Sequence, residues 1–372
     1  MLKIIVSLYK YKPTVASTIR VMAYIKNFLN MGHKVVLVTT SDEEIDLKDD
    51  QLSLVLYNEY KRGTSSIAKI LNDYRLVVAT KKVHKRGDII YTYQVPLFGF
   101  LYPKRWNVFY EETEVPMYGD NTGFKHRLSS RFRLYEVNRS KGLIVISKAL
   151  KEYYTCIGVA KEKVLISNMF VDASRFDGIE KQDVSRYIAY CGGISNQKDG
   201  VDVLIKAFAK VVQQIKELNL YVVGRFVLPE EEVHDKQLVE SLGIKDKVVF
   251  TGGIPSAEMP QMLKNADCLV LARPESKQAK YGFPTKLGEY LLTGNPVVVT
   301  AVGDIPLYLK NKQDAYLPEP GDVDGIASSI IEALTSENAQ KVGEAGCKVA
   351  MQSFNSTTES KKVIDFFQLN SF

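Results

Sequence analysis

Residues that build disulfide frameworks and metal cages are scarce in this sequence. Among its 372 residues are four cysteines and four histidines, all scattered, and no two cysteines form a CxxC pair. A disulfide framework, a zinc cage and a histidine metal site are therefore all disfavoured, and we expect no metal. Reduced, buried thiols are the better interpretation, and they favour a cytoplasmic location. The cysteines are Cys156, Cys191, Cys268 and Cys347, and the histidines are His33, His84, His126 and His234.

Long apolar runs are also missing. No stretch approaches the roughly 18 consecutive apolar residues that cross a bilayer. The apolar run at 1–6 is too short for a signal peptide and has no cleavage site. The hydrophobic fraction of 45% and the charged fraction of 25% are ordinary for a globular protein, and the length predicts about two domains. The sequence thus disfavours membrane-spanning, collagenous and disordered classes.

Two common phosphate-binding motifs are absent. No GxGxxG follows the first apolar run, where Tyr9–Thr14 stand instead, and no GxxxxGK[ST] occurs anywhere. A dinucleotide site of the usual kind is therefore disfavoured, and P-loop phosphoryl transfer is excluded. The acidic pair Asp322 and Asp324 precedes the helical run Ile326–Leu334, so helix capping is a better interpretation than metal binding.

Short apolar runs alternate with helical stretches along most of the chain. The runs are nearly continuous in apolar residues, which is typical of parallel strands buried on both faces. Between them, apolar residues from Val201 to Ile215 recur with helical spacing. This alternation predicts doubly wound α/β units. The runs are Leu2–Tyr9, Lys34–Thr40, Leu52–Tyr57, Asp88–Tyr93, Asn107–Glu111, Gly142–Ser147, Tyr187–Cys191, Leu220–Val223, Lys247–Thr251, Asp267–Ala272 and Pro296–Ala301.

The apolar pattern lapses near 172–186, and this break divides the chain. We predict a first Rossmann-like domain over 1–175 and a second over 176–355, which face each other across a cleft. The last helical stretch, within 356–372, has no strand after it. We expect that helix to pack back on the first domain.

A segment after the strand near Ala272 has the features of an anion site. Gly282 permits close backbone approach, and Pro284 suits the first turn of a helix whose N–H groups would face an anion. Lys286 adds positive charge, and Glu289 lies one turn further on, where it could accept hydrogen bonds from a ribose diol. The alternative is a helix with surface-exposed Glu and Lys side chains.

A second anion-friendly turn spans Gly192–Gly200, between a predicted strand and a predicted helix. Such a turn exposes backbone N–H groups, and Lys198 can reach a phosphate. The alternative is a tight turn with an exposed lysine. Both turns follow the carboxyl ends of parallel strands, where open α/β sheets bind ligands.

These motifs resemble the donor-binding domain of glycosyltransferase family 4. The first half also agrees, through Gly32–Val35, Ile146–Ser147 and Asn168–Asp172. The resemblance implies a GT-B fold and a hexosyltransferase-type, retaining transfer of a sugar from a UDP- or GDP-sugar to a glycan or lipid-linked acceptor. It further implies no essential metal and, for many members, a place at the inner face of the cell membrane. The motifs are Tyr187–Gly200, Val222–Arg225, Val248–Gly253, Ala266–Arg273 and Gly282–Val299.

The sequence departs from the family's pattern at two positions. Family members commonly have a glutamate where Tyr281 stands and an arginine where Gly193 stands. A diphosphate leaving group needs two or more positive donors, so we expect Arg273, at a strand end, to replace the missing arginine. The family's histidine in the first domain is not evident, and Tyr110–Pro116 resembles an acidic variant of that region.

The resemblance assigns residues to roles. We expect the catalytic residues to be Lys198, Arg273, Glu289 and Glu114. We expect the donor to be bound by Gly192, Gly193, Lys198, Gly253, Arg273, Tyr281, Gly282, Phe283, Pro284, Thr285, Lys286 and Glu289, with the base near Gly253. On the acceptor side we expect Tyr11, Ser17, Glu111 and Glu112, and one of the glutamates at 111–114 positions or deprotonates the acceptor hydroxyl.

Positive charge is concentrated in the first half. Residues 1–177 hold 28 basic and 18 acidic residues, although the net charge of the whole chain is only +6. Residues 124–134 combine apolar side chains at helical spacing with four basic ones, a pattern that suits an anionic membrane surface or an ordinary surface helix. No recognised nucleic-acid module accompanies the charge, so nucleic acid is not an expected partner.

Two other functions fit the sequence. One is a GT-B nucleotide-sugar epimerase, which would need additional carboxylates and histidines that the sequence does not clearly supply. The other is a non-catalytic nucleotide-sugar-binding protein of the same fold, an alternative raised by Gly193 and Tyr281.

Overall fold

The computed structural model describes residues 1–13, 15–45, 49–61, 65–114 and 124–371, without the side chains of 65 and 124–130. The chain forms two compact units. Unit 1 comprises Met1–Asn168 and Ser356–Phe372, and unit 2 comprises Met169–Asn355. Each unit is a parallel sheet with helices packed against it, so the predicted α/β class with two doubly wound domains is confirmed.

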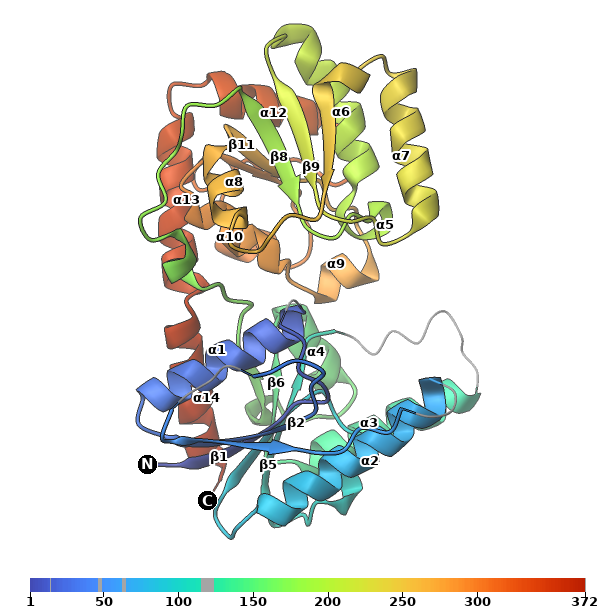
Figure 1. Cartoon of the computed structure of the whole chain (residues 1–372), viewed down its shortest axis with the longest axis vertical. Helices are drawn as coiled ribbons and strands as arrows, with labels where there is room; N and C mark the ends of the chain where they lie inside the picture. Colours follow the sequence, from blue (N-terminus) through green and yellow to red (C-terminus); the bar gives the residue numbers. More distant parts are fainter. Residues whose placement is uncertain (14, 46–48, 62–64, 115–123, 372) are drawn as a thin grey trace. The chain divides into compact units, whose positions relative to one another are not determined.

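The sheet of unit 1 has seven strands in the order β3-β2-β1-β4-β5-β6-β7. Figure 1 shows α1 and α14 on one side of this sheet and α2 and α3 on the other. The strands are β1 (Lys3–Ser7), β2 (Lys34–Thr39), β3 (Leu52–Leu56), β4 (Ile89–Tyr93), β5 (Asn107–Glu112), β6 (Gly142–Val145) and β7 (Val164–Ile166). The helices are α1 (Ala16–Asn30), α2 (Ser65–Val83), α3 (Phe124–Arg139), α4 (Lys148–Cys156) and α14 (Ser356–Asn370).

The sheet of unit 2 has five strands in the order β10-β9-β8-β11-β12. α6 and α7 lie on one side of it, and α8, α10 and α13 lie on the other (Figure 1). The strands are β8 (Tyr187–Cys191), β9 (Asn219–Val223), β10 (Val248–Gly252), β11 (Cys268–Leu271) and β12 (Val297–Val299). The helices are α5 (Asn196–Asp199), α6 (Val201–Gln214), α7 (Pro229–Ser241), α8 (Met259–Asn265), α9 (Lys277–Tyr281), α10 (Thr285–Leu292), α11 (Ile305–Tyr308), α12 (Val323–Thr335) and α13 (Ala339–Ser353).

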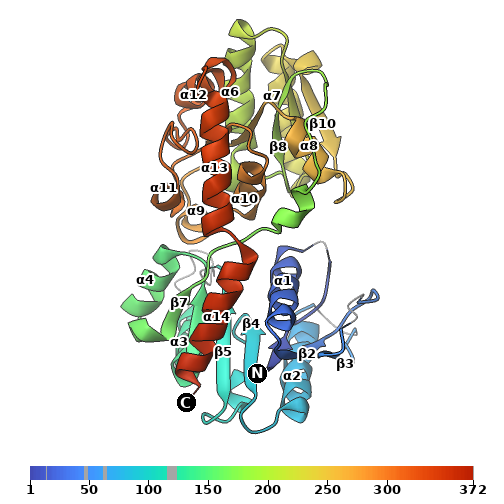
Figure 2. The same cartoon turned by 90° about the vertical axis from the view of Figure 1, so that its left-hand side faces the viewer.

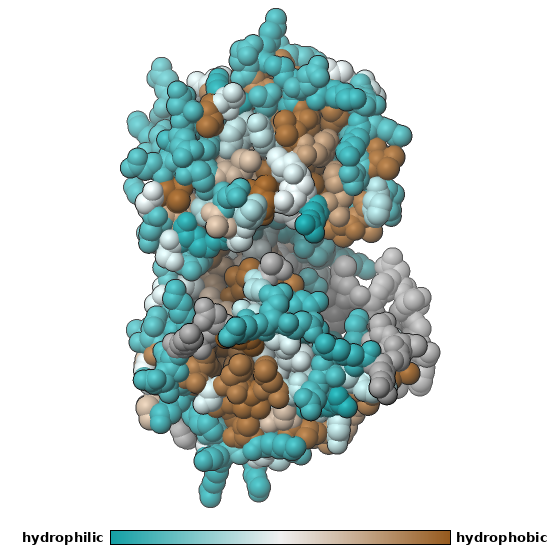
Figure 3. Space-filling view, viewed as in Figure 1, coloured by the Kyte–Doolittle hydropathy of each residue, from teal (hydrophilic) through white to brown (hydrophobic). Residues whose placement is uncertain are grey.

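The predicted strands all form, with ends shifted by one or two residues, and β7 was missed because only three residues pair. The expectation that every strand is buried on both faces is wrong for the edge strands β3 and β10. Val249 of β10 is 38% exposed. β3 lies at the edge of the sheet of unit 1, and its Leu54 and Leu56 are 43% and 58% exposed. Hydrophobic side chains gather on the face of unit 1 that Figure 3 presents, over this sheet edge. An edge strand lacks one neighbour, so its burial depends on position rather than on apolar content.

The boundary between the units falls earlier than the predicted 175/176. The N–H of Asn168 donates to the Glu359 carboxylate, and the carbonyl of Asn168 accepts from Arg20, so Asn168 belongs to unit 1. Three residues later, the N–H of Val171 donates to the Phe354 carbonyl of unit 2. Hydrogen bonding therefore fixes the division at 168/169, whereas apolar periodicity lapses only after it.

The C-terminal helix α14 packs against α1 of unit 1, as Figures 1 and 2 both show. Its Phe366 and Phe367 rings lie 5.7 and 4.6 Å from the Phe109 ring of β5. Gly142 of β6 leaves room for this packing, because a Cβ there would lie 2.5 Å from Phe366. The last helix thus completes the core of unit 1.

No helix in the described ranges has both the length and the apolar character needed to cross a bilayer.

Candidate functional site

The carboxyl ends of β8 and β11 form a cationic site in unit 2. β8 leads through Gly192 and Gly193 into α5, and β11 leads to Arg273. Because these neighbouring strands are parallel, the segments that follow them meet at one edge of the sheet. The two turns that the sequence analysis singled out are therefore brought together.

Glycine is required at two points around the turn after β8, one in the turn itself and one just after β9. A Cβ on Gly224 would lie 1.8 Å from the Gly192 carbonyl oxygen, so the ends of β8 and β9 approach closely only without a side chain there. Gly200 has φ +66°, and a Cβ on it would lie 2.0 Å from the Ala272 carbonyl oxygen. Packing against neighbouring backbone thus fixes the conformation of the turn.

The Lys286 ammonium lies against this turn. Its Nζ is 2.7 Å from Asp199 Oδ2 and 2.7 Å from the Tyr190 hydroxyl oxygen. A Cβ built on Gly192 would lie 2.6 Å from the same Nζ. Burial lowers the pKa of Lys286, and the Asp199 carboxylate opposes that effect. A lysine of α10 therefore contributes its charge to the glycine turn.

Lys198 and Arg273 lie in the same region but differ in exposure. The Lys198 side chain is exposed on α5. Arg273 is only 2% exposed, and its Nε donates to the Lys198 carbonyl oxygen at 3.3 Å. Burial lowers the pKa of Arg273. Arg273, which follows the end of β11 as expected, thus lies beneath α5 and supports that helix.

Glu289 forms an ion pair with Arg175 of the 3-10 helix η3 (Ala173–Phe176). Arg175 also donates to the Ser256 carbonyl oxygen at 3.1 Å. Burial raises the pKa of Glu289, and Arg175 lowers it. No sequence signal pointed to Arg175, because this residue lies far from Glu289 in the chain and no motif surrounds it.

The segment between α9 and α10 is built on close packing. A Cβ on Gly282 would lie 2.7 Å from the Gln278 carbonyl oxygen. Phe283, expected to line the donor site, is 8% exposed and packs against the rings of Tyr308 and Phe354, so its visible role is in the core. The other predicted residues flank it: Tyr281 ends α9 and is partly exposed, Pro284 caps α10, and Thr285 begins α10.

Gly253, expected near the base, follows β10 beside an exposed arginine. A Cβ on Gly253 would lie 3.1 Å from Arg225 Nε. The preceding Gly252 accepts a hydrogen bond from the Gly224 N–H at 2.9 Å. Gly193 is exposed, and a Cβ there would meet only Val227, at 3.6 Å. The β10 turn thus lies next to the turn after β9.

Two glutamates predicted on the acceptor side are buried in unit 1. Glu111 is 0% exposed, with Arg20 Nε 2.5 Å from its Oε1 and the Tyr91 hydroxyl donating to its Oε2. Glu112 is 3% exposed and pairs with Arg133 at 2.6 Å. The alternative that these residues are solvated loop charges is wrong, because both carboxylates are buried in ion pairs. Their assignment to the acceptor side stays a prediction.

The remaining acceptor-side residues are accessible. Glu114 is exposed just after β5, whereas Tyr11 and Ser17 are partly exposed near the start of α1. The predicted basic helix at 124–134 falls in α3, but its side chains at 124–130 lie outside the described residues. Arg131 is exposed, and Arg133 is committed to Glu112.

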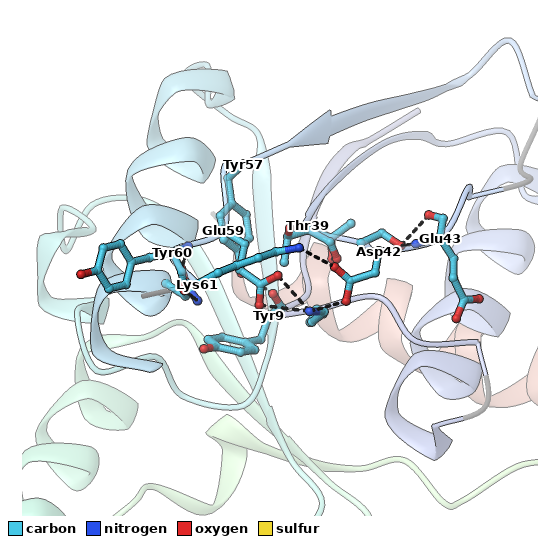
Figure 4. Close-up of polar contacts among 12 residues, drawn as sticks. Tyr9, Thr39, Asp42, Glu43, Tyr57, Glu59, Tyr60 and Lys61 are labelled. Carbon is cyan, nitrogen blue, oxygen red and sulfur yellow. Dashed lines mark hydrogen bonds and ion pairs between the residues drawn. The ribbon is translucent and has the colours of Figure 1, made fainter. Parts of the chain in front are cut away.

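A polar cluster that the sequence did not suggest ties together the ends of β1, β2 and β3 (Figure 4). Lys10 Nζ lies 2.7 Å from Asp42 and 2.9 Å from Glu59. Lys61 donates to Asp42 from the other side at 3.0 Å. The Lys10 ammonium is therefore neutralised by two carboxylates, which fix the loops at this edge of unit 1.

No group of three histidine, cysteine, aspartate or glutamate side chains suited to a metal ion occurs among the residues that the structure describes.

Comparison with known proteins gives the family likeness. The family model described as "Glycosyl transferases group 1" matches residues 185–336, which include every residue of the cationic site in unit 2 except Arg175. N-acetyl-alpha-D-glucosaminyl L-malate synthase of Bacillus anthracis is 26% identical over 221 residues, 59% of this chain and 54% of that protein. The putative colanic acid biosynthesis glycosyltransferase WcaL of Escherichia coli is 25% identical over 218 residues, 57% of this chain and 52% of that protein.

The fold likeness extends over the whole chain. HepE of Anabaena, solved in complex with UDP, matches with a TM-score of 0.74 at 17% identity and covers 100% of both chains. The chain spans about half the length of the curated relatives it matches. The resemblance to glycosyltransferase family 4 and the GT-B fold are thereby confirmed.

Proposed function

We propose that the chain is a retaining, hexosyltransferase-type glycosyltransferase that moves a sugar from a nucleotide sugar to a glycan or lipid-linked acceptor. The observation that carries the proposal is the glycine turn at 192–193 with the Lys286 ammonium against it and Lys198 exposed beside it. This arrangement lies within the segment that the group 1 glycosyl transferase model matches. The complex of HepE with UDP supports a UDP-sugar, with a GDP-sugar as the alternative.

The chemistry follows from where charge develops. When the bond between the anomeric carbon and the diphosphate breaks, negative charge grows on the leaving diphosphate. Lys198 and Lys286 would stabilise that charge directly, and Arg273 would support it from beneath α5. Because these protein cations already supply the positive charge, we expect no essential metal.

The ribose and the acceptor involve two further carboxylates. Glu289 would accept hydrogen bonds from the ribose diol once its ion pair with Arg175 rearranges. Glu114 is the one carboxylate among the three at 111–114 that is exposed, so it would position or deprotonate the acceptor hydroxyl. The acceptor would approach unit 1 near Tyr11 and Ser17, and the predicted cleft between the units belongs to this proposal.

A cytoplasmic location, peripheral on the inner face of the cell membrane, fits this function. The basic segment at 124–134 would contact anionic lipid, where lipid-linked acceptors reside. WcaL, which its description places in colanic acid biosynthesis, supports a role in polysaccharide synthesis.

Calorimetry with a panel of UDP-, GDP- and ADP-sugars, followed by a nucleotide-release assay, tests the proposal. We expect one donor to bind and to be slowly hydrolysed or transferred. Lys198→Ala should abolish nucleotide release, whereas Lys206→Ala, on α6 of the same unit, should not. Unchanged turnover in Lys198→Ala would refute the phosphate assignment.

The same experiment separates the alternatives. Binding without hydrolysis or transfer would favour a non-catalytic nucleotide-sugar-binding protein. Conversion of the donor into a second nucleotide sugar would favour an epimerase. Failure to bind any nucleotide sugar would overturn all three functions.

A further inference from the structure

Tyr190, at the end of β8, connects three segments of the cationic site through its hydroxyl group. The hydroxyl oxygen lies 2.6 Å from the Gly193 carbonyl oxygen, 2.8 Å from Asp199 Oδ2 and 2.7 Å from Lys286 Nζ. The glycine turn, α5 and the start of α10 are thus held together at one buried group. A phenol that bridges a backbone carbonyl, a carboxylate and an ammonium fixes their mutual distances.

Asp199 and Tyr190 therefore set the place of the Lys286 ammonium. We propose that both are positioning residues that hold Lys286 against the glycine turn at 192–193, where it acts as the second accessible cation for a nucleotide diphosphate. This inference rests on the proposed function and deepens it, because it names the groups that make one lysine available for the leaving group.

Exposure distinguishes the cations at this edge. The Lys198 side chain is exposed and the Lys286 side chain is 16% exposed, whereas Arg273 is 2% exposed. Arg273 directs its Nε to the Lys198 carbonyl oxygen. A diphosphate that approaches the turn would therefore meet Lys198 and Lys286 before it could meet Arg273. Lys198, Lys286 and Arg273 carry three positive charges, and Asp199 carries one negative charge. These four ionised groups therefore have a net charge of +2, which suits a diphosphate.

Asp199 is suited to hold a cation without removing it from the site. The residue is 1% exposed, and its Oδ2 accepts from both Lys286 and Tyr190. Its Oδ1 has no hydrogen-bond partner in the described structure. Lys286 has three N–H donors, of which two are used by these partners, so a third can reach a phosphate oxygen.

The charge of Lys286 depends on Asp199. Burial lowers the pKa of Lys286, and the nearby cations Lys198 and Arg273 lower it further, whereas Asp199 raises it. The other titratable groups that face it are the Tyr190 hydroxyl and the Cys191 thiol. Removal of the Asp199 charge would therefore let Lys286 lose its proton at a lower pH.

Gly193 offers a place to restore a lost charge. It is exposed next to Gly192, its φ lies outside the left-handed region, and a Cβ there would meet only Val227 at the ordinary contact distance of 3.6 Å. An arginine introduced at 193 would extend from the turn that Lys286 contacts. Its guanidinium could thus supply the second cation from the opposite segment.

The first experiment compares Lys286→Met with the double variant Lys286→Met/Gly193→Arg in the full chain, with UDP, inorganic pyrophosphate and uridine as calorimetric probes. We expect Lys286→Met to weaken UDP and pyrophosphate binding at least tenfold and to leave uridine binding unchanged. The double variant should reverse at least half of the change in log Kd that Lys286→Met causes. Gly193→Arg alone should bind UDP at least as tightly as the unmodified chain.

The second experiment follows the pH dependence of UDP binding in Asp199→Asn and Tyr190→Phe. At pH 6, where protonation of the Lys286 amine is most favoured, Asp199→Asn should bind UDP within threefold of the unmodified chain. As the pH rises to 9, the affinity of Asp199→Asn should fall at least tenfold further than that of the unmodified chain. Tyr190→Phe, which keeps the carboxylate, should lose affinity equally at all pH values.

The outcomes are distinct. Two results would overturn the inference and leave the proposed function standing. One is that Lys286→Met binds UDP within twofold of the unmodified chain. The other is that the affinity of Asp199→Asn for UDP changes with pH in parallel with that of the unmodified chain. If Lys286→Met does not fold, the pH profile of Asp199→Asn decides. Failure of the unmodified chain to bind UDP and every other nucleotide diphosphate would overturn the inference together with the proposed function.

Discussion

Arg175 forms an ion pair with Glu289, although 113 residues separate them in the chain and neither is fully buried. The pair joins η3, the first helical turn of unit 2, to α10. It occupies the carboxylate that we assign to the ribose diol. In the proposed function Arg175 therefore has two opposed effects: it competes with the ribose for Glu289, and it lowers the pKa of the Glu289 carboxyl.

Replacement of Arg175 by glutamine should make nucleotide binding depend on pH. Burial raises the pKa of Glu289 and Arg175 lowers it, so the variant's carboxyl takes up a proton at a higher pH. At pH 8 we expect Arg175→Gln to bind UDP at least as tightly as the unmodified chain does. When the pH falls from 8 to 5, the variant should lose at least threefold more affinity than the unmodified chain loses. Calorimetry measures both affinities.

The control is Lys245→Gln, because the Lys245 ammonium pairs with Glu240 on the surface. If the ratio of the UDP affinities of Arg175→Gln and the unmodified chain stays constant between pH 8 and 5, the prediction is contradicted.

Two glycines with nearly the same positive φ separate backbone strain from steric clash. Gly200 and Gly243 have φ of +66° and +67°, but only a Cβ on Gly200 meets backbone, at 2.0 Å from the Ala272 carbonyl oxygen. Gly243→Ala should lower the free energy of unfolding by about 1 kcal/mol, which is the usual cost of an alanine in the left-handed backbone conformation. Gly200→Ala should cost at least about 3 kcal/mol and abolish UDP binding, because the carbonyl or the turn must move. Urea denaturation and calorimetry check this; equal losses in the two variants would contradict it.

The buried pair Arg20–Glu111 should be essential to the stability of unit 1. Both side chains are almost fully buried, and Arg20 also donates to the Ser167 carbonyl oxygen. Arg20→Met leaves an uncompensated carboxylate and should cost about 3–5 kcal/mol. The exposed pair Lys148–Glu152, at 3.9 Å, is the matched control, and Lys148→Met should cost less than about 0.5 kcal/mol. Urea unfolding of the two variants measures the difference, and similar midpoints would show that the buried pair is dispensable.

Removal of positive charge from α3 should weaken binding to anionic vesicles. We expect the full chain to co-sediment with vesicles that contain phosphatidylglycerol and not with neutral vesicles. Replacement of Lys125, Arg127 and Arg131 by glutamine should lower the apparent affinity at least tenfold, because each basic residue near the surface contributes about 1 kcal/mol. Arg133 is left in place, since it pairs with Glu112.

The matched control for this prediction removes the same charge from unit 2. Replacement of Lys210, Lys236 and Lys245, all on its surface, by glutamine should leave vesicle binding unchanged. An equal loss in both triple variants would show that net charge, not the segment at 124–134, determines binding.

The sequence by itself determined the strands, their parallel arrangement and the two turns of the candidate site. Near-continuous apolar runs predicted buried parallel strands, and Gly282 marks a close backbone approach that the structure bears out, because a Cβ there would lie 2.7 Å from the Gln278 carbonyl oxygen. The return of the last helix to unit 1 followed from the absence of a strand after it. These features depend on local composition, which can be read along the chain.

Only the tertiary structure decided which charges are accessible. Arg273, Glu111 and Glu112 look like surface residues in sequence, yet each is buried against a partner from another element. Arg175 joined Glu289, and Asp199 joined Lys286, across more than 80 residues. Burial of a charge requires a partner to offset the cost of desolvation, and that partner is set by long-range packing. Sequence motifs therefore predicted the candidate site, whereas long-range contacts determined how each charge in it is held.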